Sequence, residues 1–507
     1  MPATAADRFS ADRFSTAHAL AALAALTLLR LLVAAATPLS ADEAYYWVWS
    51  RALAPGYLDH PPMVALWIAA GTALAGDSPL GIRLLGPIGA AIGSFLLAQA
   101  AYDLLPGTPH QRRRAGILAA ALLNATLLFG IGTVTMTPDT PLLLFWTATI
   151  WALARLHATG RGTWWLVAGA AAGLAATSKY TAALLAPAIL LWLIAIPALR
   201  PWLRRWQPWA AAALALALFA PVLAWNATQG WVSLIKQAGR GGEASLLRAL
   251  QFQGELIGGQ LGLATPIIAV LCAAGVALAL RGALRRDPGW TLLAALTALP
   301  ALVFIWHAMG ERVQANWPGI LYPAAAIATA GLTGTWRRWF APGIALGLTL
   351  TLVVWTQAAL APLALPMRLD PTLLRLGGWQ ALADDIAATA RSEGAAFVAS
   401  DNYGHAALLA RLLPPDLAVV GLEDRWALFR LPDARPTIAG QPGLLLRSAR
   451  RDDNPALRDW QALEIIALLD RARNGMTAEQ FRLYRGTARA GEQPAALMPR
   501  PDKDRTP

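Results

Sequence analysis

Two adjacent carboxylates follow the first long apolar stretch of the chain. Asp42 and Glu43 come directly after a run that ends near Pro38, and Tyr46 lies beside them in sequence. Two anions at the edge of lipid are costly unless cations or ligands meet them. A carboxylate placed there can take a proton from a substrate hydroxyl. We therefore expect Asp42 and Glu43 to be catalytic, with Tyr46 in a supporting role.

Further polar residues interrupt the apolar sequence at four later turns. They are Asp59-His60-Pro61-Pro62, Pro138-Asp139, Ser178-Lys179-Tyr180, and Glu311-Arg312 with Asn316. Fixed cations could stabilise a departing phosphate, and Lys179, Arg312 and His60 are the candidates. Each residue also has a structural interpretation: Asp139 could begin a helix, His60 could be a loop histidine, and Lys179 could be a snorkelling anchor. Asp59 and Asp139 are assigned supporting roles.

The same acids raise the question of a metal. A carboxylate-rich loop could hold a divalent cation through oxygen ligands, but no metal-ligand spacing occurs in the sequence, so no cofactor is firmly implied. The single cysteine, Cys272, lies inside an apolar run. It can form no internal disulfide, and packing is its simplest role.

The amino-acid composition indicates that these residues belong to a membrane protein. The chain has 507 residues, 56% of them hydrophobic and 14% charged, and its mean hydropathy is +0.45, outside the range usual for soluble domains. Runs of about 20 apolar residues, long enough to cross a bilayer as helices, recur up to residue 361. We expect about eleven spans, at 18–38, 80–103, 115–134, 139–156, 163–178, 181–199, 208–227, 256–280, 290–307, 317–335 and 341–361.

The arginine-rich loops predict the sidedness of these spans. Alternate loops carry the arginine clusters at 112–114, 155–161, 200–205, 281–286 and 337–338, and such loops are cytoplasmic by the positive-inside rule. The candidate site residues then share the outer side. The formal net charge of +12 is thus explained by topology, and nucleic acid is not an expected partner.

The chain divides by composition into four parts. Residues 1–17 form a cytoplasmic tail, 18–365 the transmembrane domain, 366–488 a soluble α/β domain on the outer side, and 489–507 a polar tail that we expect to be disordered. Within the soluble domain we predict helices at 379–391 and 405–413, with strands at 395–400 and 417–422. A cleavable signal peptide is the alternative for the first run, although Arg30 near its middle favours a membrane span.

The order of these motifs resembles the GT-C glycosyltransferases of family 39. That family includes the protein O-mannosyltransferases and is related to the aminoarabinose and galacturonic acid transferases that modify lipid A. Asp42-Glu43 with Asp59-His60-Pro61-Pro62 is the more specific part of the resemblance, which extends from about Asp42 to Pro323. It implies a GT-C fold, a polyprenyl-phosphate sugar donor, and Asp42 as the general base.

The resemblance also implies an inverting transfer at the outer face of a bacterial inner membrane, to a glycan, a lipid such as lipid A of lipopolysaccharide, or a protein. Lys179 matches a lysine that the lipid A transferases place near the donor phosphate. Where those enzymes have a second lysine before the paired prolines, this chain has His60, as in the protein mannosyltransferases. An unperturbed imidazole is mostly neutral at physiological pH, unlike a lysine.

Two functions of other classes are alternatives to sugar transfer. A transporter or flippase of a lipid-linked or small polar substrate fits the number of spans, but transporters carry ionisable residues near the membrane midplane, often in repeated halves. A non-catalytic scaffold would leave the clustered charges unexplained. Among enzymes, an oligosaccharide ligase or a polymerase of similar architecture remains an alternative function. The stretch 230–255 is either a lid over the site or a connector.

Overall fold

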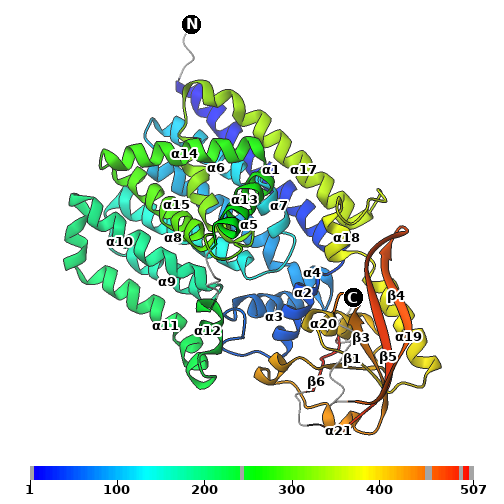
Figure 1. Ribbon diagram of the computed structural model, residues 1–507. Helices are drawn as coiled ribbons and strands as arrows, with labels where there is room; N and C mark the ends of the chain where they lie inside the picture. Colours follow the sequence, from blue (N-terminus) through cyan, green and yellow to red (C-terminus); the bar gives the residue numbers. More distant parts are fainter. Residues whose placement is uncertain (1–4, 240–244, 452–459, 490, 492–494, 502–507) are drawn as a thin grey trace. The chain divides into compact units, whose positions relative to one another are not determined.

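The structure, a computed structural model, describes residues 5–239, 245–451, 460–489, 491 and 495–501 (Figure 1). By compactness the chain forms two units, each made of three segments. The first unit comprises Met1–Leu32, Asp59–Val64 and Gly86–Leu352, and the second comprises Val33–Leu58, Ala65–Leu85 and Val353–Pro507. The chain thus passes from one unit to the other repeatedly before its C-terminal segment begins.

The first unit is helical. Its helices are α1 (Ala5–Ala36), α5 (Leu85–Leu104), α6 (Pro109–Asn124), α7 (Leu127–Gly132), α8 (Asp139–Thr159), α9 (Trp164–Ala176), η1 (Tyr180–Leu184), α10 (Leu185–Ala195), η2 (Pro197–Arg204), α11 (Trp206–Thr228), α12 (Val232–Ala238), α13 (Leu246–Ala264), α14 (Pro266–Leu284), α15 (Pro288–His307), η3 (Trp317–Leu321), α16 (Tyr322–Ala330), η4 (Gly334–Trp339) and α17 (Phe340–Leu360). One apolar core joins α5 to α17, with Trp146 and Trp192 among its fully buried side chains. Helix α9 packs between α8 and α11 in this unit (Figure 1).

Among the described residues, seven helices are long and apolar enough to cross a bilayer, or eight if a bent pair is one span. The seven are Thr16–Ala36, Pro79–Leu104, Asp139–Thr159, Trp206–Thr228, Pro266–Leu284, Pro288–His307 and Gly334–Leu360, and the bent pair is Tyr180–Ala195 with Pro197–Arg204. The other predicted spans coincide with shorter helices: α6 with α7, α9, and η3 with α16. The chain is a multi-pass helical membrane protein.

One predicted span had the wrong bounds. Residues 256–280 are not a single helix, because α13 ends at Ala264 and α14 begins at Pro266. Thr265 between them has a φ of 68°, and Pro266 can begin a helix because the N–H it lacks would have no intrahelical partner there. The apolar composition of 256–280 continues across this break, so hydropathy alone could not locate it.

Some helices of the first unit approach each other at glycines. A Cβ at Gly347 of α17 would lie 1.8 Å from the carbonyl oxygen of Ala125, which follows α6. A Cβ at Gly169 of α9 would lie 2.4 Å from the carbonyl oxygen of Ala211 of α11. Small residues permit this close backbone approach between helices in a membrane, where dispersion contacts drive association.

The second unit combines short helices with a mixed sheet. The helices are α2 (Ala41–Arg51), α3 (Met63–Ala75), which begins in the first unit, α4 (Pro79–Arg83), α18 (Pro371–Leu376), α19 (Trp379–Ser392), α20 (Tyr403–Leu412), η5 (Asp424–Leu428) and α21 (Arg435–Ile438). The strands are β1 (Phe397–Ser400), β2 (Ala418–Gly421), β3 (Pro442–Ser448), β4 (Trp460–Arg473), β5 (Met476–Ala488) and β6 (Ala496–Leu497), in the order β4-β5-β3-β1-β2-β6. Strands β2 and β3 flank β1 in parallel, and the other pairings are antiparallel.

The four elements predicted for the soluble region are confirmed as α19, β1, α20 and β2. Strand β3 and the hairpin β4–β5 were not predicted, although Asn474-Gly475 between β4 and β5 is a recognised hairpin signal; both residues have positive φ, 51° and 76°. The tail from residue 489 was expected to be disordered, but Ala496 and Leu497 pair with β2, so this part of the prediction was wrong. Its last six residues lie outside the described part of the chain.

Candidate functional site

Asp139 and Lys179 meet in the first unit. Asp139 is the first residue of α8, and Lys179 immediately precedes η1. The ammonium of Lys179 contacts both carboxylate oxygens of Asp139, at 2.7 and 2.8 Å, and Asn316 donates to the same carboxylate at 2.7 Å. Lys179 is only 5% exposed, so it is a buried, paired cation rather than a snorkelling anchor.

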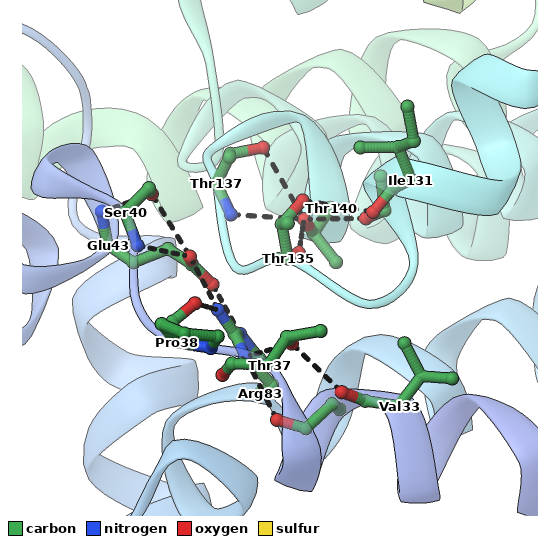
Figure 2. Close-up of polar contacts among 12 residues, drawn as sticks. Val33, Thr37, Pro38, Ser40, Glu43, Arg83, Ile131, Thr135, Thr137 and Thr140 are labelled. Carbon is green, nitrogen blue, oxygen red and sulfur yellow. Dashed lines mark hydrogen bonds and ion pairs between the residues drawn. The ribbon is translucent and has the colours of Figure 1, made fainter. Parts of the chain in front are cut away.

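The turn before α8 orients Asp139. Figure 2 shows the side chain of Thr140 folded back into this turn. The backbone N–H of Thr137 donates to Thr140 Oγ1 at 3.1 Å, and that hydroxyl lies 3.1 Å from the Thr135 carbonyl, to which it can donate. Asp139 thus begins the helix, as one interpretation of the sequence proposed, and also holds Lys179.

A cavity of about 520 Å³ in the same unit contains two more of the expected residues. His60 and Arg312 line it, together with Arg248, Phe252, Gly310, Glu311, Gln314 and Trp317. Lys179 Nζ lies 5.9 Å from the centroid of the Trp317 ring, so the buried Lys179–Asp139 pair is close to the cavity wall. The volume is in the range of small-molecule sites.

Two ion pairs flank this cavity. Lys236 of α12 contacts Asp59 Oδ1 at 2.5 Å, and Gln237 donates to the Asp59 carbonyl at 2.9 Å. Arg312 binds Glu255 of α13 through two hydrogen bonds of 2.6 and 2.9 Å, which hold the pKa of the Glu255 carboxyl below its ordinary value. Lys236, Gln237 and Glu255 belong to the stretch 230–255, which the sequence left open as a lid or a connector, and they contact residues around the cavity. Residues 240–244 of this stretch lie outside the described part of the chain.

Glu43 lies in the second unit, where it is fully buried. Arg83 donates to both of its carboxylate oxygens, at 2.6 and 2.8 Å. The remaining hydrogen bonds of Arg83 go to the Thr37 hydroxyl and to the carbonyls of Ala34, Thr37 and Pro38, as Figure 2 shows in part. Ser40 and Glu43 also form a capping box at the start of α2. Glu43 therefore fixes the end of α1 and the beginning of α2.

Asp42 precedes Glu43 on α2 and is half-buried. The hydroxyl of Tyr403, the first residue of α20, donates to Asp42 Oδ1 at 3.3 Å. Tyr46, expected to support the site, is 8% exposed and packs edge-on against Trp49 with a centroid distance of 4.9 Å. The predicted general base thus lies in a polar and aromatic environment within its own unit.

Sequence reasoning missed Asp77, which is 2% exposed in the second unit. Asp77 accepts hydrogen bonds from Trp47 at 2.9 Å and Arg411 at 2.7 Å, and pairs with Arg51 at 2.9 Å. It also missed Arg83, whose position at the start of an apolar span was the available signal. Arg30, noted in the first span, is fully buried with its guanidinium over the Phe129 ring at 5.3 Å.

Metal binding was left open by the sequence. Across the described ranges, no group of three or more histidine, cysteine, aspartate or glutamate side chains is placed to hold a metal ion. Arginine, lysine, asparagine or tyrosine side chains contact the carboxylates of Asp42, Glu43, Asp59, Asp77, Asp139 and Glu255. A carboxylate can transfer a proton, and fixed cations can stabilise an anion.

Comparisons with known proteins identify the class. The family model for dolichyl-phosphate-mannose-protein mannosyltransferases matches residues 59–225. The lipid A galacturonosyltransferase RgtD of Rhizobium johnstonii is 28% identical over 379 residues, which are 72% of this chain and 76% of RgtD. The crystal structure of ArnT from Cupriavidus metallidurans bound to undecaprenyl phosphate shares the fold, with a TM-score of 0.60, 14% identity, and coverage of 92% of this chain and 97% of ArnT. The apo structure of ArnT matches with a TM-score of 0.59 and 13% identity over 93% of this chain and 98% of ArnT.

The fold and the sequence matches together define a membrane glycosyltransferase. The chain resembles the GT-C glycosyltransferases in both sequence and fold, in agreement with its motif order. The chain is similar to RgtD, a lipid A transferase, although it has His60 at the position where a lysine was expected in the lipid A transferases. The transporter and scaffold alternatives are not supported.

Proposed function

We propose that the protein transfers a sugar from a polyprenyl phosphate to lipid A or a related envelope glycan. The observation that carries this proposal is the cavity lined by His60, Arg312 and Trp317, beside which Lys179 is buried and paired with Asp139. A phosphate leaving group needs cations that are already in place. The similarity to RgtD favours lipid A as the first acceptor to test, with a protein acceptor as the alternative.

The donor phosphate is assigned to the cation-bearing side of this cavity. Arg248 and Arg312 line it directly, and the Lys179 ammonium lies 5.9 Å from the centroid of the Trp317 ring. Asp139 holds that ammonium in one position, and Asn316 donates to the Asp139 carboxylate, so the ammonium need not reorganise when negative charge develops on the phosphate. His60 supplies a hydrogen-bonding group rather than a fixed charge.

Asp42 is assigned the role of general base. Its carboxylate takes the proton of the acceptor hydroxyl as the acceptor oxygen bonds to C1 of the sugar. The bond between C1 and the phosphate oxygen breaks, and the polyprenyl phosphate leaves with that electron pair. The attack from the opposite side inverts C1. Glu43, expected from the sequence to share the catalytic role, is assigned to holding α2, because it is buried against Arg83.

The reaction is placed at the outer face of a bacterial inner membrane, where the C-terminal domain would also lie. The support is the arginine bias of the alternate loops, which predicts that Asp42, His60, Lys179 and Arg312 share one aqueous boundary. This premise can be tested with an impermeant maleimide. In a Cys272→Ala background, Leu53→Cys and Gln229→Cys should be labelled from outside in intact cells, and His110→Cys should not. Labelling of Leu53→Cys and Gln229→Cys from opposite sides would exclude a shared site.

The function is tested first in cells. Mass spectrometry of lipid A and other envelope glycans from a deletion strain should show one missing sugar, which complementation restores. Asp42→Asn should fail to restore it while inserting normally in the membrane. Asp384→Asn, the same change at an exposed position of α19, should restore it fully. Near-normal transfer by Asp42→Asn would refute the base assignment, and an unchanged envelope in the deletion strain would refute the proposed function.

A further inference from the structure

The contact between Asp42 and Tyr403 joins two helix N-termini within the second unit. Asp42 is the second residue of α2, and Tyr403 is the first of α20. A Cβ at Gly404 would lie 2.9 Å from the Cβ of Ala41, so the two helix ends approach closely. The carboxylate proposed as general base is therefore in direct contact with a residue of the C-terminal segment.

Tyr403 is held from both its backbone and its ring. Its backbone N–H donates to Glu423 Oε2 at 2.8 Å. The Arg425 guanidinium lies 3.9 Å from the centroid of the Tyr403 ring and donates to Glu423 Oε1 at 2.7 Å. The Tyr45 ring packs on the same tyrosine with a centroid distance of 4.5 Å. These contacts leave the Tyr403 hydroxyl little freedom to turn away from Asp42.

A second set of contacts keeps α20 on α2. Arg411, near the end of α20, donates to Asp77 at 2.7 Å and lies over the Trp47 ring at 4.6 Å. Trp47 belongs to α2 and itself donates to Asp77. Both ends of α20 are thus tied to the α2 region, one through Tyr403 and the other through Arg411.

We propose that Tyr403 is a positioning residue that orients the Asp42 carboxylate and favours its ionised form. This inference rests on the proposed function, in which Asp42 accepts the proton. A hydroxyl that donates to a carboxylate stabilises the anion and lowers the pH at which it becomes a base. A carboxylate has about four acceptor positions, so it can accept hydrogen bonds from Tyr403 and from an acceptor hydroxyl together. The C-terminal segment then contributes to catalysis itself.

The test compares pH profiles of purified variants. The donor is undecaprenyl phosphate carrying the sugar lost in the deletion strain, and the acceptor is that strain's unmodified glycan. Tyr403→Phe keeps the ring but removes the hydroxyl, so the acid limb of the kcat/KM profile should move to higher pH, with at least a fivefold loss of rate at its acid end. The KM for the donor should not change, because Tyr403 acts on the base.

Tyr484 provides a matched control. Its hydroxyl is buried in the same unit and makes no hydrogen bond to any described residue, so Tyr484→Phe should leave the profile unchanged. Glu423→Gln, which loosens Arg425 and the backbone of Tyr403, should move the acid limb in the same direction by a smaller amount. It serves as the second variant if Tyr403→Phe does not fold.

The outcomes separate this inference from the function on which it rests. If Asp42→Asn is inactive but Tyr403→Phe has the wild-type pH profile, the positioning role is refuted and the base assignment stands. If Tyr403→Phe cannot be purified, a wild-type pH profile for Glu423→Gln leads to the same conclusion. If Asp42→Asn retains turnover, both are refuted. A shift in Tyr484→Phe equal to that in Tyr403→Phe would also overturn the inference, because any lost hydroxyl would then have the same effect.

Discussion

The buried pair of Glu43 and Arg83 makes a quantitative prediction about stability. The five N–H groups of Arg83 reach six acceptor atoms at 2.6–2.9 Å, so one N–H of Nη1 is shared. Both side chains are at most 1% exposed. Replacing Arg83 with Met keeps most of the volume but leaves the Glu43 carboxylate buried without its cation. Removing one member of such a pair costs about 3–5 kcal/mol. We expect the free energy of unfolding to fall by this amount.

The measurement is reversible unfolding in mixed detergent micelles, followed by tryptophan fluorescence, for which the 22 tryptophans provide signal. The double variant Glu43→Gln with Arg83→Met should recover part of the loss, because the uncompensated charge is then absent. Arg435→Met, which breaks an exposed pair with Asp433 in the same unit, should cause no measurable change. A loss under about 1 kcal/mol for Arg83→Met, the range of surface pairs, would refute the reasoning.

Three further predictions concern other parts of the molecule. Lys179→Ala should weaken donor binding about 10- to 100-fold, as loss of a charged hydrogen bond worth about 1.5–3 kcal/mol implies, and should leave acceptor binding unchanged; equal donor affinity by titration would contradict it. Burial lowers the pKa of His405 to about 4, below the value near 6.5 of the unfolded chain, so stability is full above pH 6.5 and is lost as pH falls toward 4. His405→Gln should flatten that slope by up to about 1.4 kcal/mol per pH unit, and an unchanged slope in unfolding experiments would argue against a neutral buried imidazole. Gly347→Ala should destabilise the first unit by about 1–3 kcal/mol through overpacking, whereas Gly254→Ala, with open space around it, should not; similar unfolding midpoints for the two variants would be inconsistent with the close approach of α17.

Much of the site could be predicted because charged residues are conspicuous in an apolar chain. From the sequence, Asp139 and Lys179 each had both a structural and a functional interpretation, and the ion pair between them in the structure decides between the two. No sequence spacing encodes a contact between residues 40 positions apart. Arg312 was expected to bind the donor phosphate and Asp59 to support the site. Their partners in the structure, Glu255 and Lys236, lie in the stretch whose role was left open. Which charged residues form ion pairs depends on the tertiary structure, and a hydropathy pattern does not predict it.

The adjacent acids illustrate what local geometry adds. Successive side chains of a helix project about 100° apart. Adjacent residues such as Asp42 and Glu43 therefore cannot both face one ligand from the same helix. The spacing of Ser40 and Glu43 is a capping-box signature, a signal for a structural role of Glu43 that the prediction of a catalytic role overlooked. The partner Arg83 could not be foreseen, because its contact closes a loop of 40 residues.

The hydrogen bond between Asp42 and Tyr403 joins residues 361 positions apart in the chain. During synthesis, α2 must therefore wait for almost the whole polypeptide before its partner helix exists. A ribosome that stalls after the last membrane span would leave an inserted protein whose base lacks its orienting hydroxyl. Completion of translation would then act as the activating step, so that truncated products could occupy the membrane yet turn over donor lipid poorly.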